Sequence, residues 1–157
     1  MSWRDLDDPS PFDMSAFRAW AKDMNDRVLD EFRRNEGRVS GGIPVLLLTH
    51  TGARSGKTYT TPLAYSRDGG RYVVIASMGG SPVNPQWFRN VARNPAVTLE
   101  VGRERFPARA QIPEEAERAR LFAAQAAAYP SANFDGYAKF TARTIPVVAF
   151  QPLAPDS

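Results

Sequence analysis

Between residues 12 and 35, apolar side chains recur every three or four positions, which is the spacing of one face of an α-helix. The stripe consists of Met14, Phe17, Trp20, Met24, Val28 and Phe32. Charges of both signs occupy the positions between them, and Gly37 follows as a helix-ending residue. We therefore predict an amphipathic helix over about residues 12–36 that packs on its own domain. Weak association of this helix with a membrane surface is the alternative.

After residue 44 the pattern changes to short runs that are typical of strands. The aliphatic run "VLLLTH" suits a fully buried strand. Residues 58–77 contain two β-branched and aromatic runs around "DGG", which predicts a hairpin. Pro62 lies inside the first run and indicates an edge strand or a bulge, because proline cannot donate to a sheet ladder.

The second half of the chain continues with another hairpin and further helices. A short helix is expected over residues 85–93 with Asn84 as its N-cap, followed by strands at 97–101 and 105–112. An Ala-rich helix begins at residue 113, and a last strand closes the chain at 144–152. This order of about six strands, hairpin upon hairpin, predicts a single α+β domain over residues 1–157. Its architecture would be an antiparallel β-barrel flanked by helices.

Composition narrows the classes of function. A chain of 157 residues with 43% apolar residues can bury one core. Its formal net charge of +3 is too small to predict a nucleic-acid partner. With no Cys and one His, disulfides, thiolate metal sites and multi-histidine metal sites are excluded, so we expect no metal and a chemistry carried by a cofactor. The first residues include early acids and no long apolar run, which favours a cytoplasmic protein.

The segment Gly52-Ala-Arg-Ser-Gly56-Lys57-Thr58 superficially matches a nucleoside-triphosphate loop. Three residues, where such a loop needs four, separate its first glycine from Gly-Lys, and a strand pattern follows where a helix is required. We therefore reject the interpretation of this segment as the phosphate loop of a nucleoside triphosphatase. A tight turn that carries Arg54, Ser55 and Lys57 can still bind another anion, and a solvated turn with ordinary surface charges is the alternative.

Three segments in the same order resemble the deazaflavin-dependent nitroreductase family of actinobacteria: "GARSGKTYTTPL", "DGGRYVVIAS" and "GGSPVNPQWFRN". The similarity runs from about residue 45 to the end and includes "AYPS" and "RTIPVV". The resemblance implies a six-stranded antiparallel split β-barrel of the FMN-binding type. It also implies that the chain binds reduced coenzyme F420 and transfers a hydride to a small electron-poor acceptor, such as a quinone or nitro compound.

The resemblance also implies a set of site residues. Arg54, Ser55 and Lys57 would bind the phosphodiester and the carboxylate-bearing tail of F420. The remaining expected cofactor contacts are Thr60, Thr61, Pro62, Leu63, Ala76, Ser77, Met78, Gln86, Trp87 and Asn90. For Trp87, core packing is the alternative. On the acceptor side, Tyr129, Phe134 and Tyr137 could form a lid, and Tyr129, Tyr137 or Ser77 could deliver a proton, as could solvent.

Other functions remain open at this point. An FMN-binding reductase would keep the fold and change the cofactor, and a carrier would bind a cofactor or lipophilic ligand without turnover. A hydrolase built on His50 is disfavoured, because the chain has no G-x-S-x-G elbow. Monomer and homodimer are both compatible with the sequence.

Overall fold

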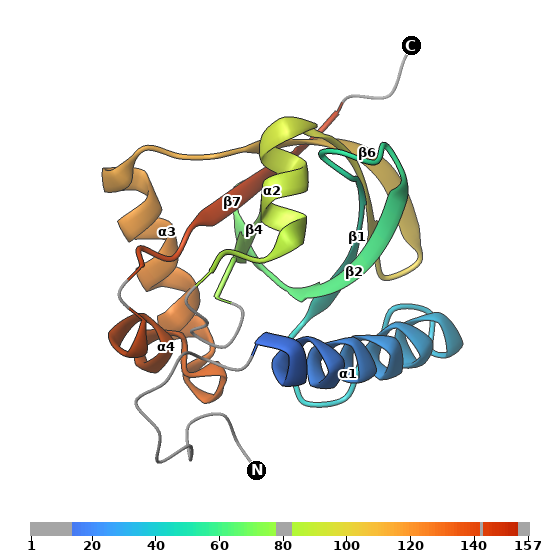
Figure 1. Ribbon diagram of the computed structural model, residues 1–157, viewed down its shortest axis with the longest axis horizontal. Helices are drawn as coiled ribbons and strands as arrows, with labels where there is room; N and C mark the ends of the chain where they lie inside the picture. The colour runs from blue at the N-terminus through green and yellow to red at the C-terminus, as the bar shows by residue number, and fades with distance from the viewer. Residues whose placement is uncertain (1–13, 78–82, 142, 154–157) are drawn as a thin grey trace.

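The computed structural model describes residues 14–77, 83–141 and 143–153, in which helices surround a curled antiparallel sheet (Figure 1). Its strands are β1 (Val45–Thr51), β2 (Thr58–Ala64), β3 (Ser66–Asp68), β4 (Arg71–Ile75), β5 (Ala96–Val101), β6 (Glu104–Gln111) and β7 (Val147–Pro152). The helices are α1 (Met14–Arg34), α2 (Gln86–Arg93), α3 (Glu115–Ala128) and α4 (Phe134–Phe140), with a 3-10 turn at Pro130–Ala132. The strand order is β2-β1-β5-β6-β7-β4-β3, and every neighbouring pair is antiparallel. The predicted α+β class and antiparallel sheet are confirmed.

The predicted strand number of six is wrong, because the expected hairpin over residues 58–77 divides at Tyr65. Residues before Tyr65 pair with β1, whereas the three after it pair with β4. Two contacts hold the dividing residue: its N–H donates to the Pro44 carbonyl at 3.1 Å, and its carbonyl accepts from the Tyr129 hydroxyl at 2.9 Å. Since β2 and β3 are the first and last strands of the sheet, its two edges come together at Tyr65.

The interpretation of Pro62 as an edge-strand residue is confirmed. It pairs with Leu47 of β1, and β2 is the outermost strand on that side of the sheet. An edge strand tolerates proline because the missing N–H can lie on the unpaired side.

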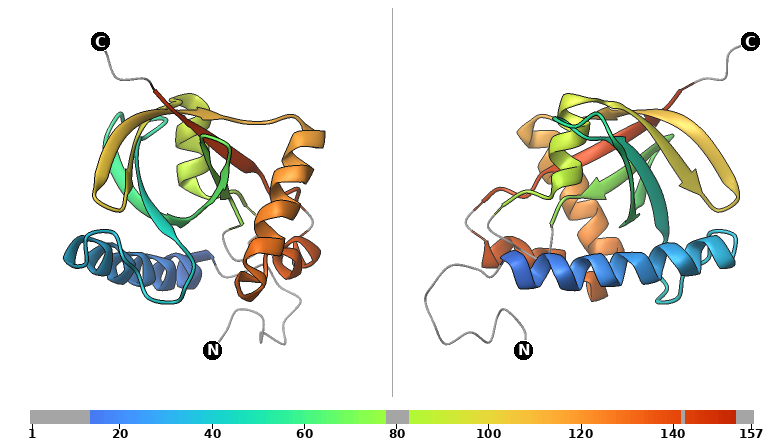
Figure 2. Two further views of the ribbon diagram at one scale, coloured as in Figure 1. Left: turned by 180° about the vertical axis from the view of Figure 1, so that it is seen from behind. Right: turned by 45° about the vertical axis from the view of Figure 1, so that its right-hand side comes forward.

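Each face of the sheet packs a separate hydrophobic cluster. Inside the curl lie Leu46, Leu48, Tyr72, Val74, Val97, Leu99, Val148 and Phe150, together with Trp87 and Val91 of α2. The alternate residues of β4 and β7 point outward and pack against α3 and α4, through side chains that include Val73, Ile75, Leu121 and Phe122. Figure 2 shows the resulting arrangement, in which α3 and α4 cover one side of the sheet and α1 lies along one end.

Helix α1 buries only part of its apolar stripe. Phe17 and Phe32 are buried, whereas Trp20 is 59% exposed and Met24 is 42% exposed. The chain turns sharply after the helix at Gly37, which has φ +91° and lies so close to Gly102 that a Cβ atom would be 2.4 Å from the Gly102 Cα. This contact fixes the end of α1 against the β5–β6 turn. None of the helices within the described residues has the length and apolar character that a membrane crossing requires.

Helix α2 begins at Gln86 rather than Pro85, and the predicted N-cap role of Asn84 is wrong. No side chain caps this helix. The Asn84 Oδ1 atom instead accepts a hydrogen bond from Nη1 of Arg143 at 2.8 Å. The same guanidinium donates through Nη2 to the carbonyl of Ser77 at 2.7 Å, so Arg143 draws the end of β4 and the start of α2 together.

Candidate functional site

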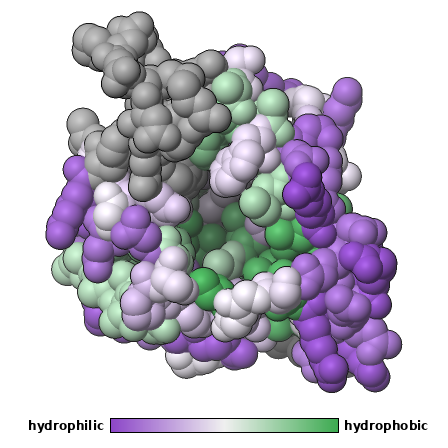
Figure 3. Space-filling view, turned by 90° about the horizontal axis from the view of Figure 1, so that it is seen from below, coloured by the Kyte–Doolittle hydropathy of each residue, from purple (hydrophilic) through white to green (hydrophobic). Residues whose placement is uncertain are grey.

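A cavity of about 890 Å³ lies where α1, the turn after β1, strand β2 and the start of α2 meet. Its size falls within the range of small-molecule and cofactor sites. The face of the molecule seen in Figure 3 is hollowed near its centre, with hydrophobic residues in the hollow and a rim that is strongly hydrophilic on the right and mixed elsewhere. This combination suits a ligand with an apolar planar part and a polar extension.

The cavity lining favours an anion. Arg54 of the turn and Arg89 of α2 contribute to the lining, and no Asp or Glu does so within the described residues. The first turn of α2 also lines the cavity, and the amino end of a helix carries a partial positive charge. A phosphate or carboxylate of a bound ligand would therefore find two guanidinium groups and, among the residues that the structure describes, no competing acid.

The turn after β1 uses most of its backbone N–H groups in hydrogen bonds within the fold. The N–H of Gly52 donates to the Lys57 carbonyl at 2.7 Å, and that of Gly56 donates to the Gly52 carbonyl at 3.2 Å. The N–H of Lys57 donates to Ser55 Oγ at 3.2 Å, and that of Ala53 donates to Asn90 Oδ1 at 3.0 Å. Four of the six N–H groups of residues 52–57 are thus already used, so the side chains of Arg54 and Ser55 and the N–H groups of the same two residues are what the turn offers to an anion.

A buried polar cluster closes the inner end of the cavity. Asn90 and His50 are 1% and 4% exposed, and Nδ2 of Asn90 lies 3.0 Å from Nδ1 of His50. On the other side of the imidazole, Nε2 lies 2.9 Å from Oγ1 of Thr61. The ring of Tyr59 stacks on that of His50, with centroids 5.9 Å apart. Desolvation by burial lowers the pKa of His50 from 6.5 to about 4, so the imidazole is neutral at pH 7.

Apolar and aromatic side chains form the remaining walls. Trp87 is only 6% exposed and belongs to the inner core cluster, yet it also contributes to the cavity lining. Across the cavity, Trp20 comes from α1, and Phe134 and Tyr137 come from α4. Flat aromatic walls of this kind fit a planar ring system.

The structure brings together eleven of the residues expected from the sequence. Those that line the cavity are Arg54, Ser55, Thr61, Pro62, Leu63, Ser77, Gln86, Trp87, Asn90, Phe134 and Tyr137. Met78 lies outside the described residues. The lining does not include Lys57, Thr60, Ala76 or Tyr129.

Each of these four residues has a structural reason for its position. Lys57 follows the turn and is exposed. Because side chains alternate along a strand, Thr60 points to the face opposite Thr61 and bonds Thr49 at 3.1 Å. Ala76 is buried in the core, and Tyr129 holds the Tyr65 carbonyl.

The sequence reasoning missed Arg89 and the whole contribution of α1. A helical spacing would have found the arginine, since Gln86, Arg89 and Asn90 stand at i, i+3 and i+4 and share one face of α2. No local signal could have found Trp20 and Met24 as cavity residues, because their stripe reads the same whether it faces a core or a ligand.

Comparisons with known proteins agree on one family. The model of the family described as F420H(2)-dependent quinone reductase matches residues 22–152. A putative F420H(2)-dependent quinone reductase of Mycobacterium tuberculosis is 41% identical over 110 residues, covering 70% of this chain and 91% of the relative. An F420H(2)-dependent quinone reductase of the same species is 41% identical over 114 residues, covering 71% of this chain and 75% of its own length.

Solved structures agree with these relatives. A structure described as an F420-H2 dependent reductase superposes with a TM-score of 0.62 at 37% identity, covering 69% of this chain and 94% of that chain. Another, described as a domain-swapped dimer, gives a TM-score of 0.63 at 32% identity, covering 85% of this chain and 98% of that chain. A heme storage protein of Vibrio cholerae, at 17% identity and a TM-score of 0.54 over 80% of this chain and 88% of its own, shares the fold alone.

Proposed function

Because the chain belongs to the F420H(2)-dependent quinone reductase family, we propose that the cavity between α1, β2 and α2 is the site where reduced F420 and its electron acceptor meet. The chain is an F420H2-dependent oxidoreductase. We take its curled antiparallel sheet to be a split β-barrel of the flavin-binding type. When bound, the cofactor supplies the hydride, and the acceptor is of the quinone type, with nitro compounds as further candidates.

The observation that carries the placement is the pair Arg54 and Arg89 in a cavity lining that has no carboxylate within the described residues. F420 carries a phosphodiester and a carboxylate-bearing tail, and a guanidinium binds either group through two parallel hydrogen bonds. The residues present therefore fit this cofactor. Ser55 beside Arg54 can add a hydroxyl donor.

In this proposal the protein also positions the cofactor and the acceptor, and it excludes water from the cavity. Leu63, on the same strand face as Thr61, and the neighbouring Pro62 contribute apolar atoms to the cavity wall, while Trp87 and Phe134 confine the planar acceptor. Tyr137 and Ser77 line the cavity and are the protein groups placed to deliver a proton to the reduced product.

Titration of the purified chain with F420, followed by the cofactor's fluorescence, tests the proposal. We expect saturable binding and oxidation of reduced F420 when a quinone is added. Arg54→Ala and Arg89→Ala should each weaken F420 binding about ten- to a hundredfold, since a charged hydrogen bond contributes about 1.5–3 kcal/mol. Arg93→Ala removes an exposed arginine one turn further along α2 and is the matched control.

Three other results would redirect the proposal. Tighter binding of FMN than of F420 in parallel titrations would favour the FMN-dependent reductase. Tight F420 binding without oxidation across a panel of quinones and nitroaromatics would favour a carrier. An unchanged affinity for F420 in both Arg54→Ala and Arg89→Ala would show that the cofactor tail does not bind at this end of the cavity.

The exposed side chains of α1 support an approach of lipophilic acceptors from this side. Trp20 and Met24 lie at the cavity and are 59% and 42% exposed, whereas the outer face of the helix carries ion pairs such as Lys22–Asp26. A weak association with a membrane surface would bring such an acceptor to the cavity. Co-sedimentation with phospholipid vesicles tests this extension, and equal recovery of Trp20→Ser and the unaltered chain would contradict it.

A further inference from the structure

A continuous series of hydrogen bonds runs from α2 to strand β2 behind the cavity. Gln86 Nε2 donates to Asn90 Oδ1 at 3.0 Å, and the N–H of Ala53 donates to the same oxygen at 3.0 Å. Asn90 Nδ2 then meets His50 Nδ1 at 3.0 Å, and His50 Nε2 meets Thr61 Oγ1 at 2.9 Å. Five residues from α2, β1, β2 and the turn between the two strands are thus joined.

The direction of every bond in this series follows from one backbone group. The N–H of Ala53 can only donate, so the Asn90 atom that it meets must be the oxygen. The amide nitrogen of Asn90 must then face His50 and donate to Nδ1. That assignment leaves Nδ1 without a proton.

A neutral imidazole carries one proton, which must therefore be on Nε2 of His50. Nε2 donates to the Thr61 hydroxyl, which acts as an acceptor in this bond. The hydrogen of that hydroxyl remains available. No acceptor for it occurs among residues 14–77, 83–141 and 143–153, and Thr61 lines the cavity.

We propose that His50 is a positioning residue, which with Asn90 fixes Thr61 as a hydrogen-bond donor to an acceptor atom of the ligand in the cavity. The ligand atom would be a carbonyl oxygen, a ring nitrogen or a hydroxyl oxygen. The inference rests on the proposed function in taking F420 as that ligand. Because hydrogen bonds in series polarise one another, the donor at the end of this one is stronger than an isolated threonine.

The burial of the cluster argues for this role over simple packing. A buried imidazole and amide cost free energy unless all their polar atoms are paired, and an apolar pair of similar shape would fill the space without that cost. Here each nitrogen of His50 is paired, and both Asn90 side-chain atoms are used. The series therefore ends at the cavity with its donor fixed in advance of ligand binding.

The tautomer can be measured without any ligand, because His50 is the sole histidine of the chain. In the ¹⁵N spectrum of histidine-labelled protein without a histidine tag, we expect one neutral imidazole with the proton on Nε2 at pH 7. The Asn90→Ala variant should show a mixture of the two tautomers. A proton on Nδ1, or a cationic ring at pH 7, in the unaltered chain would overturn the proposal.

Affinity for F420 tests the other end of the series. Thr61→Val should weaken binding about tenfold, the upper range for one neutral hydrogen bond. His50→Leu should weaken it by a similar factor, and the double variant should bind no more weakly than Thr61→Val alone. His50→Gln, whose amide can reach the position of Nε2, should restore most of the affinity. Thr49→Val, on the opposite face of the neighbouring strand, is the matched control.

The outcomes separate the two levels of the proposal. If the unaltered chain does not bind F420, the proposed function falls, and with it the identity of the ligand. If the unaltered chain binds F420 but Thr61→Val binds it as tightly, the inference alone falls. Independent, multiplying losses in His50→Leu and Thr61→Val would likewise overturn it, because they would show that His50 does not act through Thr61.

Discussion

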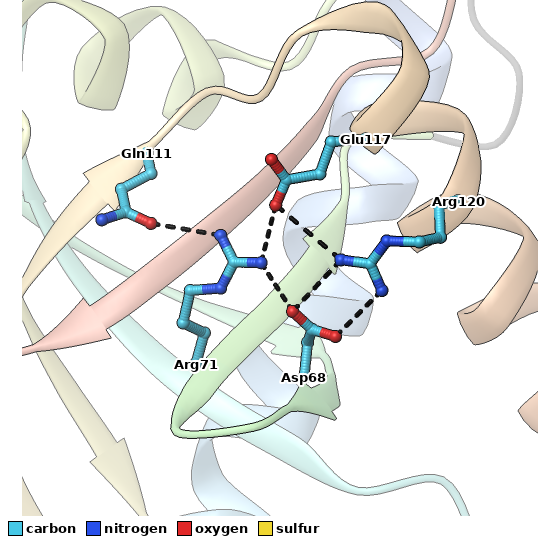
Figure 4. Close-up of polar contacts among 5 residues, drawn as sticks. All are labelled: Asp68, Arg71, Gln111, Glu117 and Arg120. Atoms are coloured by element: carbon cyan, nitrogen blue, oxygen red, sulfur yellow. Dashed lines mark hydrogen bonds and ion pairs between the residues drawn. The ribbon is translucent and has the colours of Figure 1, made fainter.

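Two polar clusters of this protein differ in burial and in charge. The cluster around His50 and Asn90 is buried and neutral, and the donors and acceptors available there determine which atoms bond to one another. The cluster of Asp68, Arg71, Glu117 and Arg120 is ionic and partly exposed, and it joins the β3–β4 hairpin to α3 (Figure 4). The first lies against the cavity, whereas the second only fastens a helix to the sheet.

The ionic cluster tolerates variation because its partners overlap. Arg71 Nη2 donates to Asp68 at 2.5 Å and to Glu117 at 2.7 Å, and its Nη1 donates to Gln111 at 3.3 Å. Arg120 is a second donor to Asp68 at 3.1 Å. Loss of one contact leaves others and solvent to replace it, whereas His50 and Asn90 are almost fully buried and have far less access to such replacements.

The largest difference between the clusters should appear when one polar side chain is removed from each. Asn90→Ala leaves the buried His50 Nδ1 and the partly buried Ala53 N–H unpaired, and at about 1–3 kcal/mol for a buried group and less for a partly buried one we expect a loss of about 3 kcal/mol or more in the free energy of unfolding. Urea denaturation at pH 7 measures it. A loss below about 1 kcal/mol would show that water reaches the cluster.

The second difference between the two clusters should appear in how stability changes at low pH. Burial holds the pKa of His50 at about 4 in the folded chain against 6.5 for a free histidine, so the unfolded chain binds more protons between these values. Stability therefore falls as the pH is lowered from about 6.5 to 4, by on the order of 3 kcal/mol. His50→Gln should lack this phase. Identical pH profiles of unfolding for the two proteins would contradict the assignment.

The smallest effect should come from the ionic cluster. Hydrogen bonds from Arg120 and then Arg71 lower the pKa of Asp68 from 3.8 to about 2, so its contribution is present above pH 3.8 and is lost as the pH falls towards 2. Asp68→Asn should cost less than about 1 kcal/mol at pH 7, and added salt should reduce that cost further. Urea denaturation at two salt concentrations checks it; a larger cost that salt does not change would mean that the cluster is effectively buried.

The comparison also explains what the sequence could predict. Hydrophobic spacing and turn chemistry sufficed for α1, α3, the β5–β6 hairpin and the edge position of Pro62, because those signals are local. The division at Tyr65 was missed, since the choice of β1 or β4 as partner is made by distant residues. Asn84 was wrongly predicted as an N-cap for the same reason. Its side chain accepts a hydrogen bond from Arg143, which is distant in the sequence.

Within the candidate site, the residue types were easier to predict than their directions. Thr60 and Thr61 were both expected at the cofactor, although side chains two apart, not adjacent ones, share a strand face. The alternation that runs from Leu46 through Leu48 continues to His50, so the strand itself placed the imidazole on the inner face. The sequence could not predict that β1, β2 and α2 lie close together. Their contact makes the buried histidine part of a hydrogen-bond series.

Pro62 has a further consequence for how two copies of the chain can associate. Strand β2 is an outer edge of the sheet, and an open edge is a template on which a second chain can add a strand. A proline in the middle of this edge withholds one donor from any incoming strand and interrupts the ladder that it would form. The same residue that lines the cavity therefore also weakens any edge-to-edge pairing of two chains through β2.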